Sequence, residues 1–213
     1  MGLYVKGANG AFYGKVGSVV GSNWRSINYL RSLPKPSSKK ATEKQIAHRA
    51  KFAMVLRFLA PMRQLINIGQ GDKSRQKSTG FNQVTNEVMA LVQGQYPDFT
   101  IPYKDVVFAS GLMSNVKPKI GKTMDGDWEM TWVHDENLQG TLPDDILSII
   151  LYDASRNDYY VFQGGLREAQ SYTFNSAALG SGEFHIWYMF TSADGLSSTS
   201  SNYYGTILLE EEP

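Results

Sequence analysis

Residues 145–153 read DILSIILYD, a run of strand-forming side chains that opens at an aspartate. From Asp98 onward the chain continues as short alternating runs separated by turn residues. The pattern predicts strands over residues 103–109, 116–121, 127–133, 146–152, 159–163, 170–174, 184–191 and 203–209. Eight short strands in about 110 residues are typical of an immunoglobulin-like β-sandwich.

The segment before this region is rich in glycine. Residues 14–34 read GKVGSVVGSNWRSINYLRSLP, in which glycines interrupt valine, tryptophan, isoleucine and tyrosine. We expect one or two strands that bend at the glycines. The spacing of these glycines lacks the Lys-Ser/Thr ending of a phosphate-binding loop and differs from the Gly-x-Gly-x-x-Gly pattern of dinucleotide-binding folds. We therefore interpret the glycines as the positions where the strands bend.

Two helices are predicted between these regions. Thr42 and Gln45 have the spacing of a capping box, and apolar residues then recur at helical spacing until Pro61, which should kink the helix or end it near Leu59. The apolar positions expected on its buried side are Ile46, Ala50, Phe52, Ala53, Leu56 and Leu59. A second helix is expected over residues 81–93. The predicted class is α+β: an N-terminal strand segment and two helices (1–98), then the β-sandwich (99–213).

The near-zero net charge of +1 conceals a strong asymmetry along the chain. The first 80 residues carry 15 Lys and Arg and two acids, a net charge of +13. Residues 81–213 carry 6 Lys and Arg and 18 Asp and Glu, a net charge of −12. A basic region attracts polyanions or acidic protein surfaces. Three partners would satisfy it: nucleic acid, the acidic part of the same chain, or the acidic part of another copy.

Candidate interaction residues combine this basic region with aromatic side chains. Tyrosine and tryptophan are enriched at protein interfaces, and several fall in predicted strands where alternate residues cannot all face a core. The candidates are Trp24, Arg25, Arg31, Lys39, Lys40, Arg49, Lys51, Tyr159, Tyr160 and Tyr203.

Catalytic and metal-binding patterns are weak. The chain has no cysteine, and its three histidines, His48, His134 and His185, are scattered without a metal-ligand spacing. His185 should face the side of its strand opposite to its two neighbours. An acidic run matches part of a calcium-loop template at Asp125, Asp127, Glu129 and Glu136. Met130 stands where that loop needs glycine, so an acidic turn before a strand is the better interpretation. We predict no cofactor and no metal.

Residues 112–209 resemble a fibronectin type III or related immunoglobulin-like module. The resemblance is carried by WEMTW (128–132), DILSIILYD (145–153) and LGSGEF (179–184). The turn in the last stretch lacks the module's proline, and Phe184 stands where the module has its corner tyrosine.

Nearly the whole chain is similar to an uncharacterised family of Bacteroidota proteins. The shared motifs, in order, are GKVGSVVGSNW (14–24), YLRSLPKP (29–36), QIAHRAKF (45–52), SGL (110–112), WVHDEN (132–137) and DILSIILYD (145–153). The resemblance implies an architecture and no agreed activity. Some members of the family are similar to phage-type structural proteins.

These observations favour a non-enzymatic structural or assembly protein that associates head to tail with other copies of itself. The alternative is nonspecific binding of nucleic acid by residues 1–80. A hydrolase ranks third, because only isolated polar residues favour it. The N-terminus MGLYVKGANG lacks the apolar core of a signal peptide, and no stretch of about 18 apolar residues occurs. We therefore expect a cytoplasmic or virion-associated protein with no membrane partner.

Overall fold

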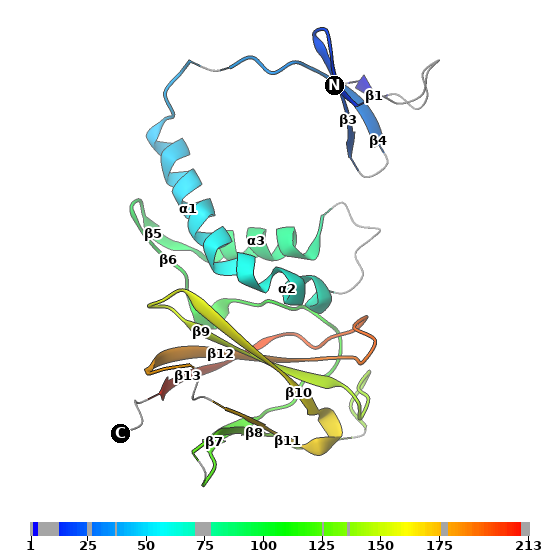
Figure 1. Cartoon of the computed structure of the whole chain (residues 1–213), viewed down its shortest axis with the longest axis vertical. Coiled ribbons are helices and arrows are strands. Elements are labelled where there is room, and N and C mark those ends of the chain that lie inside the picture. The colour runs from blue at the N-terminus through cyan, green and yellow to red at the C-terminus, as the bar shows by residue number, and fades with distance from the viewer. Residues whose placement is uncertain are drawn as a thin grey trace. The chain divides into compact units, whose positions relative to one another are not determined.

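Helices and antiparallel strands make up the computed structural model, which describes residues 2–3, 13–24, 27–36, 38–70, 78–124, 126–135, 137–175 and 179–209 (Figure 1). The protein is therefore α+β, as predicted. The chain divides into two compact units, residues 1–42 and 43–213. This division differs from the predicted boundary between residues 98 and 99, because the helices share a hydrophobic core with the later strands.

The first unit is a small antiparallel sheet. Its strands are β1 (Gly2–Leu3), β2 (Gly14–Val16), β3 (Val19–Trp24) and β4 (Ile27–Ser32), in the order β1-β4-β3-β2. Val16 pairs with Val19, so a two-residue turn joins β2 to β3, and Gly17 in that turn has a φ of 58°. The glycine-rich segment thus forms more strands than the one or two expected, because this turn reverses the chain at once.

The second unit begins with helices. They are α1 (Glu43–Leu59), a 3₁₀ turn (Ala60–Met62), α2 (Arg63–Gly69) and α3 (Gly80–Leu91). The predicted end of the first helix at Leu59, ahead of Pro61, is confirmed. The second predicted helix corresponds to α3, whose first turn is capped because the Thr79 hydroxyl accepts a hydrogen bond of 3.2 Å from the Asn82 N–H. Among the described helices, none is long and apolar enough to cross a membrane.

Two antiparallel sheets follow, in the orders β10-β9-β12-β13 and β11-β8-β7. A hairpin of β5 (Gln93–Gln95) and β6 (Asp98–Thr100) precedes them. The remaining strands are β7 (Lys119–Lys122), β8 (Trp128–Thr131), β9 (Ile146–Asp153), β10 (Asp158–Leu166), β11 (Ser171–Phe174), β12 (Gly182–Thr191) and β13 (Asn202–Leu209). These seven strands overlap seven of the eight predicted ranges.

The predicted strand over residues 103–109 is wrong. Tyr103–Asp105 form a 3₁₀ turn, in which the Asp105 N–H donates to the Pro102 carbonyl at 3.0 Å. Further along, the N–H groups of Phe108 and Ala109 both donate to the Ser201 hydroxyl, at 2.7 and 3.2 Å. Because a side chain accepts hydrogen bonds from these two N–H groups, they do not require pairing with a neighbouring strand.

Both faces of the four-stranded sheet are buried. Alternate residues of β9 and β12, such as Ile150 and Trp187, pack against the helices. The residues between them, such as Ile149 and Phe184, pack with β8 and β11 of the three-stranded sheet. In β9 every residue from Leu147 to Asp153 is buried. The unit therefore has three layers, with the four-stranded sheet between the helices and the second sheet (Figure 1).

A buried ion pair lies beside the core shared by the two sheets. Arg167 Nε and Asp145 Oδ2 are 2.9 Å apart, and both side chains are 0 % exposed. The guanidinium also lies 4.1 Å from the centre of the Phe190 ring, and the Trp132 indole N–H donates to the Arg167 carbonyl at 2.8 Å. Burial lowers the pKa of Arg167, and the adjacent Asp145 opposes that shift.

Candidate interaction surfaces

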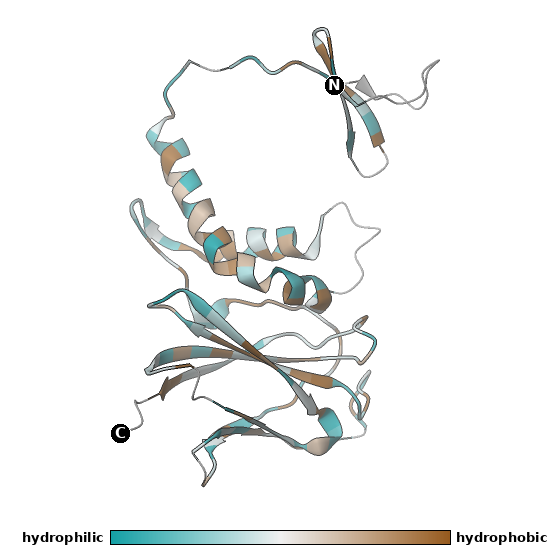
Figure 2. Ribbon diagram, viewed as in Figure 1, coloured by the Kyte–Doolittle hydropathy of each residue, from teal (hydrophilic) through white to brown (hydrophobic). Residues whose placement is uncertain are grey.

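The N-terminal sheet has almost no interior of its own. Among the described residues between 13 and 36, Gly21 alone is buried. Tyr13, Val16, Trp24 and Ile27 are all exposed, Trp24 by 46 %, and Figure 2 shows hydrophobic residues along these strands. A sheet needs another element against its apolar face, because strand pairing by itself gives marginal stability. The sheet thus presents apolar surface suited to a partner.

The strand register places the described cations of this sheet on one face. Val20 lies opposite both Lys15 and Arg31, and Trp24 lies opposite Ile27. Paired residues share a face, and alternate residues along a strand do too. We call this the basic face; it consists of Lys15, Val20, Ser22, Trp24, Ile27, Tyr29 and Arg31.

The opposite face of the sheet is uncharged among the described residues of β2, β3 and β4. It consists of Gly14, Val16, Val19, Gly21, Asn23, Asn28, Leu30 and Ser32. Of the predicted interaction residues, Trp24 and Arg31 therefore lie together on the basic face. Arg25 lies outside the described residues.

The other predicted basic residues occupy the linker and α1. Lys39 and Lys40 are exposed before the helix, and Arg49 and Lys51 lie within it. From Glu43 to Met54 no residue of α1 is buried. The expected burial of Ile46, Phe52 and Ala53 is thus wrong: all three are exposed, and the buried residues of α1 are Val55, Phe58 and Leu59. The apolar spacing continues along the helix, but the first turns extend beyond the layers that cover its last turns (Figure 1).

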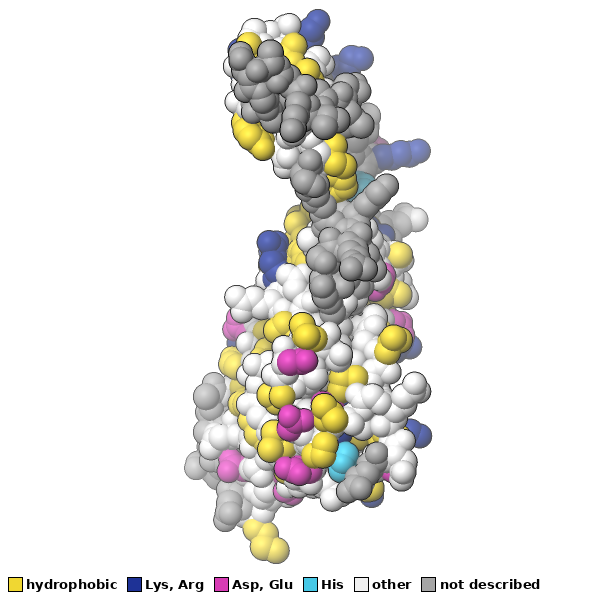
Figure 3. Space-filling view, turned by 90° about the vertical axis from the view of Figure 1, so that its right-hand side faces the viewer, with side chains coloured by type: hydrophobic (Ala, Val, Ile, Leu, Met, Phe, Trp, Pro, Cys, Tyr) yellow, Lys and Arg dark blue, Asp and Glu magenta, His cyan; other side chains and the backbone are white. Residues whose placement is uncertain are grey.

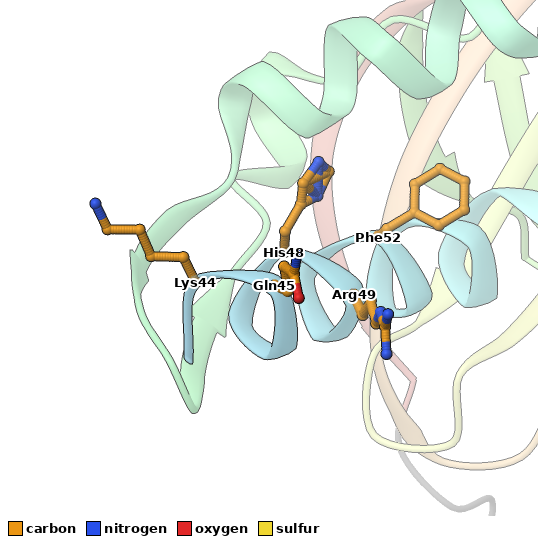
Figure 4. A pocket seen from close by; sticks show the side chains of 5 residues that line it. All are labelled: Lys44, Gln45, His48, Arg49 and Phe52. Atoms are coloured by element: carbon orange, nitrogen blue, oxygen red, sulfur yellow. The ribbon is translucent and has the colours of Figure 1, made fainter. Parts of the chain in front are cut away.

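A hollow with a volume of about 540 Å³ runs along this exposed half of α1, lined by Lys44, Gln45, His48, Arg49 and Phe52. Figure 4 shows that His48 and Phe52, which are four residues apart, point to the same side of the helix. Phe52 is 43 % exposed. The exposed half of α1 thus combines cations with an aromatic ring.

The three predicted tyrosines contribute to the cores. Tyr159 packs against Phe58 and Tyr152, with ring centres 5.7 and 4.6 Å apart, and burial raises the pKa of its phenol. Tyr160 packs edge-on against Phe184 at 6.0 Å. The Tyr203 hydroxyl lies 2.9 Å from Nδ1 of His185. Since all three are partly buried, we leave them out of the surfaces proposed below.

A second surface lies at the end of the two sheets where β8, β10 and β12 finish and β9, β11 and β7 begin. Thr131 pairs with Ser171 and Lys119, and Ile146 pairs with Leu166 and Thr191, so these strand ends coincide. The chain around them carries exposed leucines, valine and acids. We call it the acidic end; its residues are Leu112, Val133, Asp135, Leu142, Asp144, Leu166, Glu168, Asp194 and Leu196.

The acidic end combines apolar and negative groups. Figure 3 faces this side of the molecule and shows acidic side chains interspersed with hydrophobic ones. Leu112 is 100 % exposed. Three described cations lie close to it: Arg167, which is buried against Asp145, and Lys117 and Lys119, at the start of the edge strand β7. Exposed apolar groups among mostly negative charges are typical of a protein contact.

Hydrogen bonds keep two of these acids ionised. Asp194 accepts from the Ser192 hydroxyl at 2.6 Å and from the Leu196 N–H at 2.9 Å, and these bonds lower the pKa of its carboxyl. The backbone N–H and side-chain amide of Asn137 donate to Asp135 at 2.9 and 3.0 Å and lower the pKa of that carboxyl too. Both carboxylates are negative at neutral pH.

A hollow of about 630 Å³ opens at the acidic end. Gly111, Leu112, Gly140, Leu196 and Ser198 are among the residues that line it. A Cβ atom on Gly111 would lie 1.8 Å from the Ser198 carbonyl oxygen, so glycine is required where these two segments meet. The Ser198 hydroxyl donates to the Gly69 carbonyl at 2.8 Å, which fixes one wall to the end of α2.

The histidines lie on different elements: His48 on α1, His134 after β8 and His185 in β12. His185 faces the helices, opposite Phe184 and Ile186, as predicted. Within the described part of the chain, no group of three His, Asp or Glu residues is placed to hold a metal ion. Of the calcium-loop template, Asp125 and Glu136 lie outside the described residues, and Glu129 lies in strand β8.

The described elements thus define an α+β protein in which a basic sheet and helix precede a layered unit with an acidic end. The chain belongs to a family of unknown function (DUF6266), whose model matches residues 11–205. The match confirms the resemblance to an uncharacterised family and extends over β2, the helices and every strand through β12. A search of curated proteins found no match.

Proposed function

We propose that the protein is a non-enzymatic structural or assembly protein that associates head to tail, with the basic N-terminal sheet of one copy on the acidic end of the next. The observation that carries the proposal is the N-terminal sheet itself, which exposes apolar side chains beside cations and has one buried residue among those described. Such a sheet gains stability when a partner covers it. The acidic end of a second copy has the matching character, apolar with the opposite charge.

The two surfaces differ from each other, so the contact is heterologous. A heterologous contact leaves one unpaired surface at each end of an open assembly, so copies add until a ring closes or a filament forms. Burial of apolar groups supplies most of the affinity in such a contact, and opposite charges supply orientation and speed of association. The net charges of +13 and −12 on the two parts of the chain support this arrangement.

We also propose that the two large sheets form a fibronectin type III-like module. The order of the strands supports it: β7, β8 and β11 take the places of strands A, B and E, and β10, β9, β12 and β13 take those of C′, C, F and G. Modules of this architecture commonly serve as protein-contact domains on cell surfaces.

Self-association is expected to depend on salt. At about 0.05 M salt the chain should form oligomers in a concentration-dependent way, and the association constant should fall at least about tenfold by about 0.5 M, because screening shortens the reach of exposed charges. Sedimentation velocity or light scattering over a dilution series measures this. A monomer at every protein and salt concentration would contradict the proposed function.

Nonspecific nucleic-acid binding is the second candidate function, and the exposed half of α1 favours it. Lys44, His48 and Arg49 line the same hollow as Phe52, on a part of the helix that buries no side chain. Cations neutralise phosphates, and an exposed aromatic ring can stack on a base. The acidic end of the same chain would repel a nucleic acid, so we rank this function below assembly.

Binding to single-stranded DNA is tested by fluorescence polarisation at several salt concentrations. If α1 contacts phosphates, the variant Lys44→Gln/Arg49→Gln should bind about tenfold more weakly near 0.1 M salt and reduce the salt slope by about 1.4. The matched control is Lys117→Gln/Lys119→Gln, which removes the same charge from the segment around β7 and should change neither quantity. An equal loss in both variants, or no binding by the unaltered protein, contradicts a nucleic-acid site on α1.

A further inference from the structure

We infer that the N-terminal sheet docks through its basic face, with the uncharged face turned away, onto the acidic end of a second copy. This inference rests on the proposed head-to-tail assembly and specifies its two contact surfaces. The sheet is exposed on both sides, and the strand register determines which side chains lie on each side. The choice of the docking face follows from this division.

The basic face has its charges and its aromatic groups in two zones. Lys15, Val20 and Arg31 form a row across three adjacent strands, which places the two cations about 10 Å apart. Trp24 and Ile27 form a second row four residues further along β3, about 13 Å away. Tyr29 lies between the rows. A partner must therefore offer negative groups and apolar groups side by side.

The acidic end offers both kinds of group. Asp194 and Leu196 lie in one loop, and Asp144 and Leu142 lie in another. Leu166 and Glu168 stand at the end of β10, where the Glu168 N–H donates to the Pro143 carbonyl at 3.0 Å and so joins the second loop to this strand end. Each acid is thus accompanied by an exposed leucine two residues away in the chain.

The hollow at the acidic end gives the aromatic row a place to bind. It has a volume of about 630 Å³ and is flanked by Leu112 and Leu196. Aromatic side chains that enter a recess are the usual anchors of protein interfaces. Trp24 is the large aromatic residue of the basic face that is exposed, so we assign it to this hollow.

The uncharged face fits the acidic end poorly. Its described side chains on β2, β3 and β4 are glycine, valine, leucine, serine and asparagine. Docking through it would take the carboxylates of the acidic end out of water without a cation to pair with them, which costs free energy. Docking through the basic face pairs them with Lys15 and Arg31.

Two variants with the same change in net charge test which face docks. Lys15→Gln/Arg31→Gln removes two charges from the basic face. Val16→Glu/Ser32→Glu adds two negative charges to the opposite face, at the ends of the row Val16–Val19–Ser32 that lies next to the row of Lys15 and Arg31. The association constant is measured by sedimentation at about 0.05 M salt.

The variant of the basic face should associate about tenfold more weakly than the unaltered chain, and the variant of the opposite face should differ from it by less than about threefold. An equal loss in the two variants, or a larger loss in the second, overturns the assignment of the face while the head-to-tail assembly stands. If the unaltered chain is monomeric throughout, the proposed function itself fails.

A charge exchange tests the acceptor. Lys15→Glu/Arg31→Glu and Glu168→Lys/Asp194→Lys should each associate poorly alone, and mixing them should restore association to within about threefold of the unaltered chain, because each supplies the charge that the other lacks. Lys15→Glu/Arg31→Glu mixed with Lys15→Gln/Arg31→Gln is the control and should remain weak, because both variants keep the acidic end and lack the cations of the basic face. If the first mixture also remains weak, the acidic end is not the acceptor.

Discussion

Replacement of Arg167 by Met is expected to lower the free energy of unfolding of the 43–213 unit by about 3–5 kcal/mol. The guanidinium is completely buried and lies 2.9 Å from Asp145 Oδ2. Without it, a carboxylate with no exposure to water would lose the cation that compensates its charge. The contact of the guanidinium with the Phe190 ring would be lost as well. Urea unfolding followed by circular dichroism measures the difference.

Two further variants separate charge from packing. Arg167→Met/Asp145→Leu removes both charges and should recover most of the lost stability, because apolar groups of similar size can replace a buried ion pair. Arg63→Met is the matched surface control. Arg63 is exposed and its guanidinium lies 4.4 Å from the centre of the Phe81 ring, so its loss should cost less than about 1 kcal/mol. A change of under about 1 kcal/mol for Arg167→Met would contradict this account of the pair.

Phe58→Ala should destabilise the same unit by about 3–5 kcal/mol. Phe58 projects from the last turns of α1 into the core between the helices and the sheet, where its ring centre lies 5.5 Å from Tyr103, 5.9 Å from Phe108 and 5.1 Å from Tyr152. Truncation leaves a cavity in the middle of this aromatic cluster and removes its contacts. Urea unfolding provides the measurement.

The same helix supplies the control for this variant. Phe52→Ala changes the same residue type six positions earlier, where the residue is 43 % exposed, and should alter stability by less than about 0.5 kcal/mol. A similar loss of unfolding free energy in the two variants would mean that Phe52 is also buried in solution. A small loss for Phe58→Ala would contradict the assigned core.

Much of the strand pattern could be predicted from the sequence. The runs that became β9 and β12 are bounded by turn residues and rich in strand-forming side chains, so local composition identified them. Residues 103–109 were predicted as a strand in the same way, but Tyr103–Asp105 form a turn, and the backbone N–H of Phe108 donates to the Ser201 hydroxyl, about ninety residues away. Local sequence patterns do not predict contacts between residues so far apart in the chain.

Burial on the helices was harder to predict. Apolar residues recur at helical spacing from Ile46 to Leu59 without interruption. Only the last turns of the helix are buried, because the helix extends beyond the layers that cover it. The charge asymmetry located a basic and an acidic part of the chain. It could not show that Lys15 and Arg31 share a face with Trp24, because that depends on the pairing register of β2, β3 and β4. The self-association and nucleic-acid hypotheses stay predictions.

The four-stranded sheet, buried on both faces, has a consequence for how the chain can be cut. Its two central strands contribute side chains to the helical core and to the core between the sheets, so neither layer can be removed without leaving bare hydrophobic surface on the other. A fragment that starts at residue 99 would lack every helix and be prone to aggregate. We expect the compact unit that starts at Glu43 to fold by itself, and its loss of structure should be cooperative from the helices to the last strand.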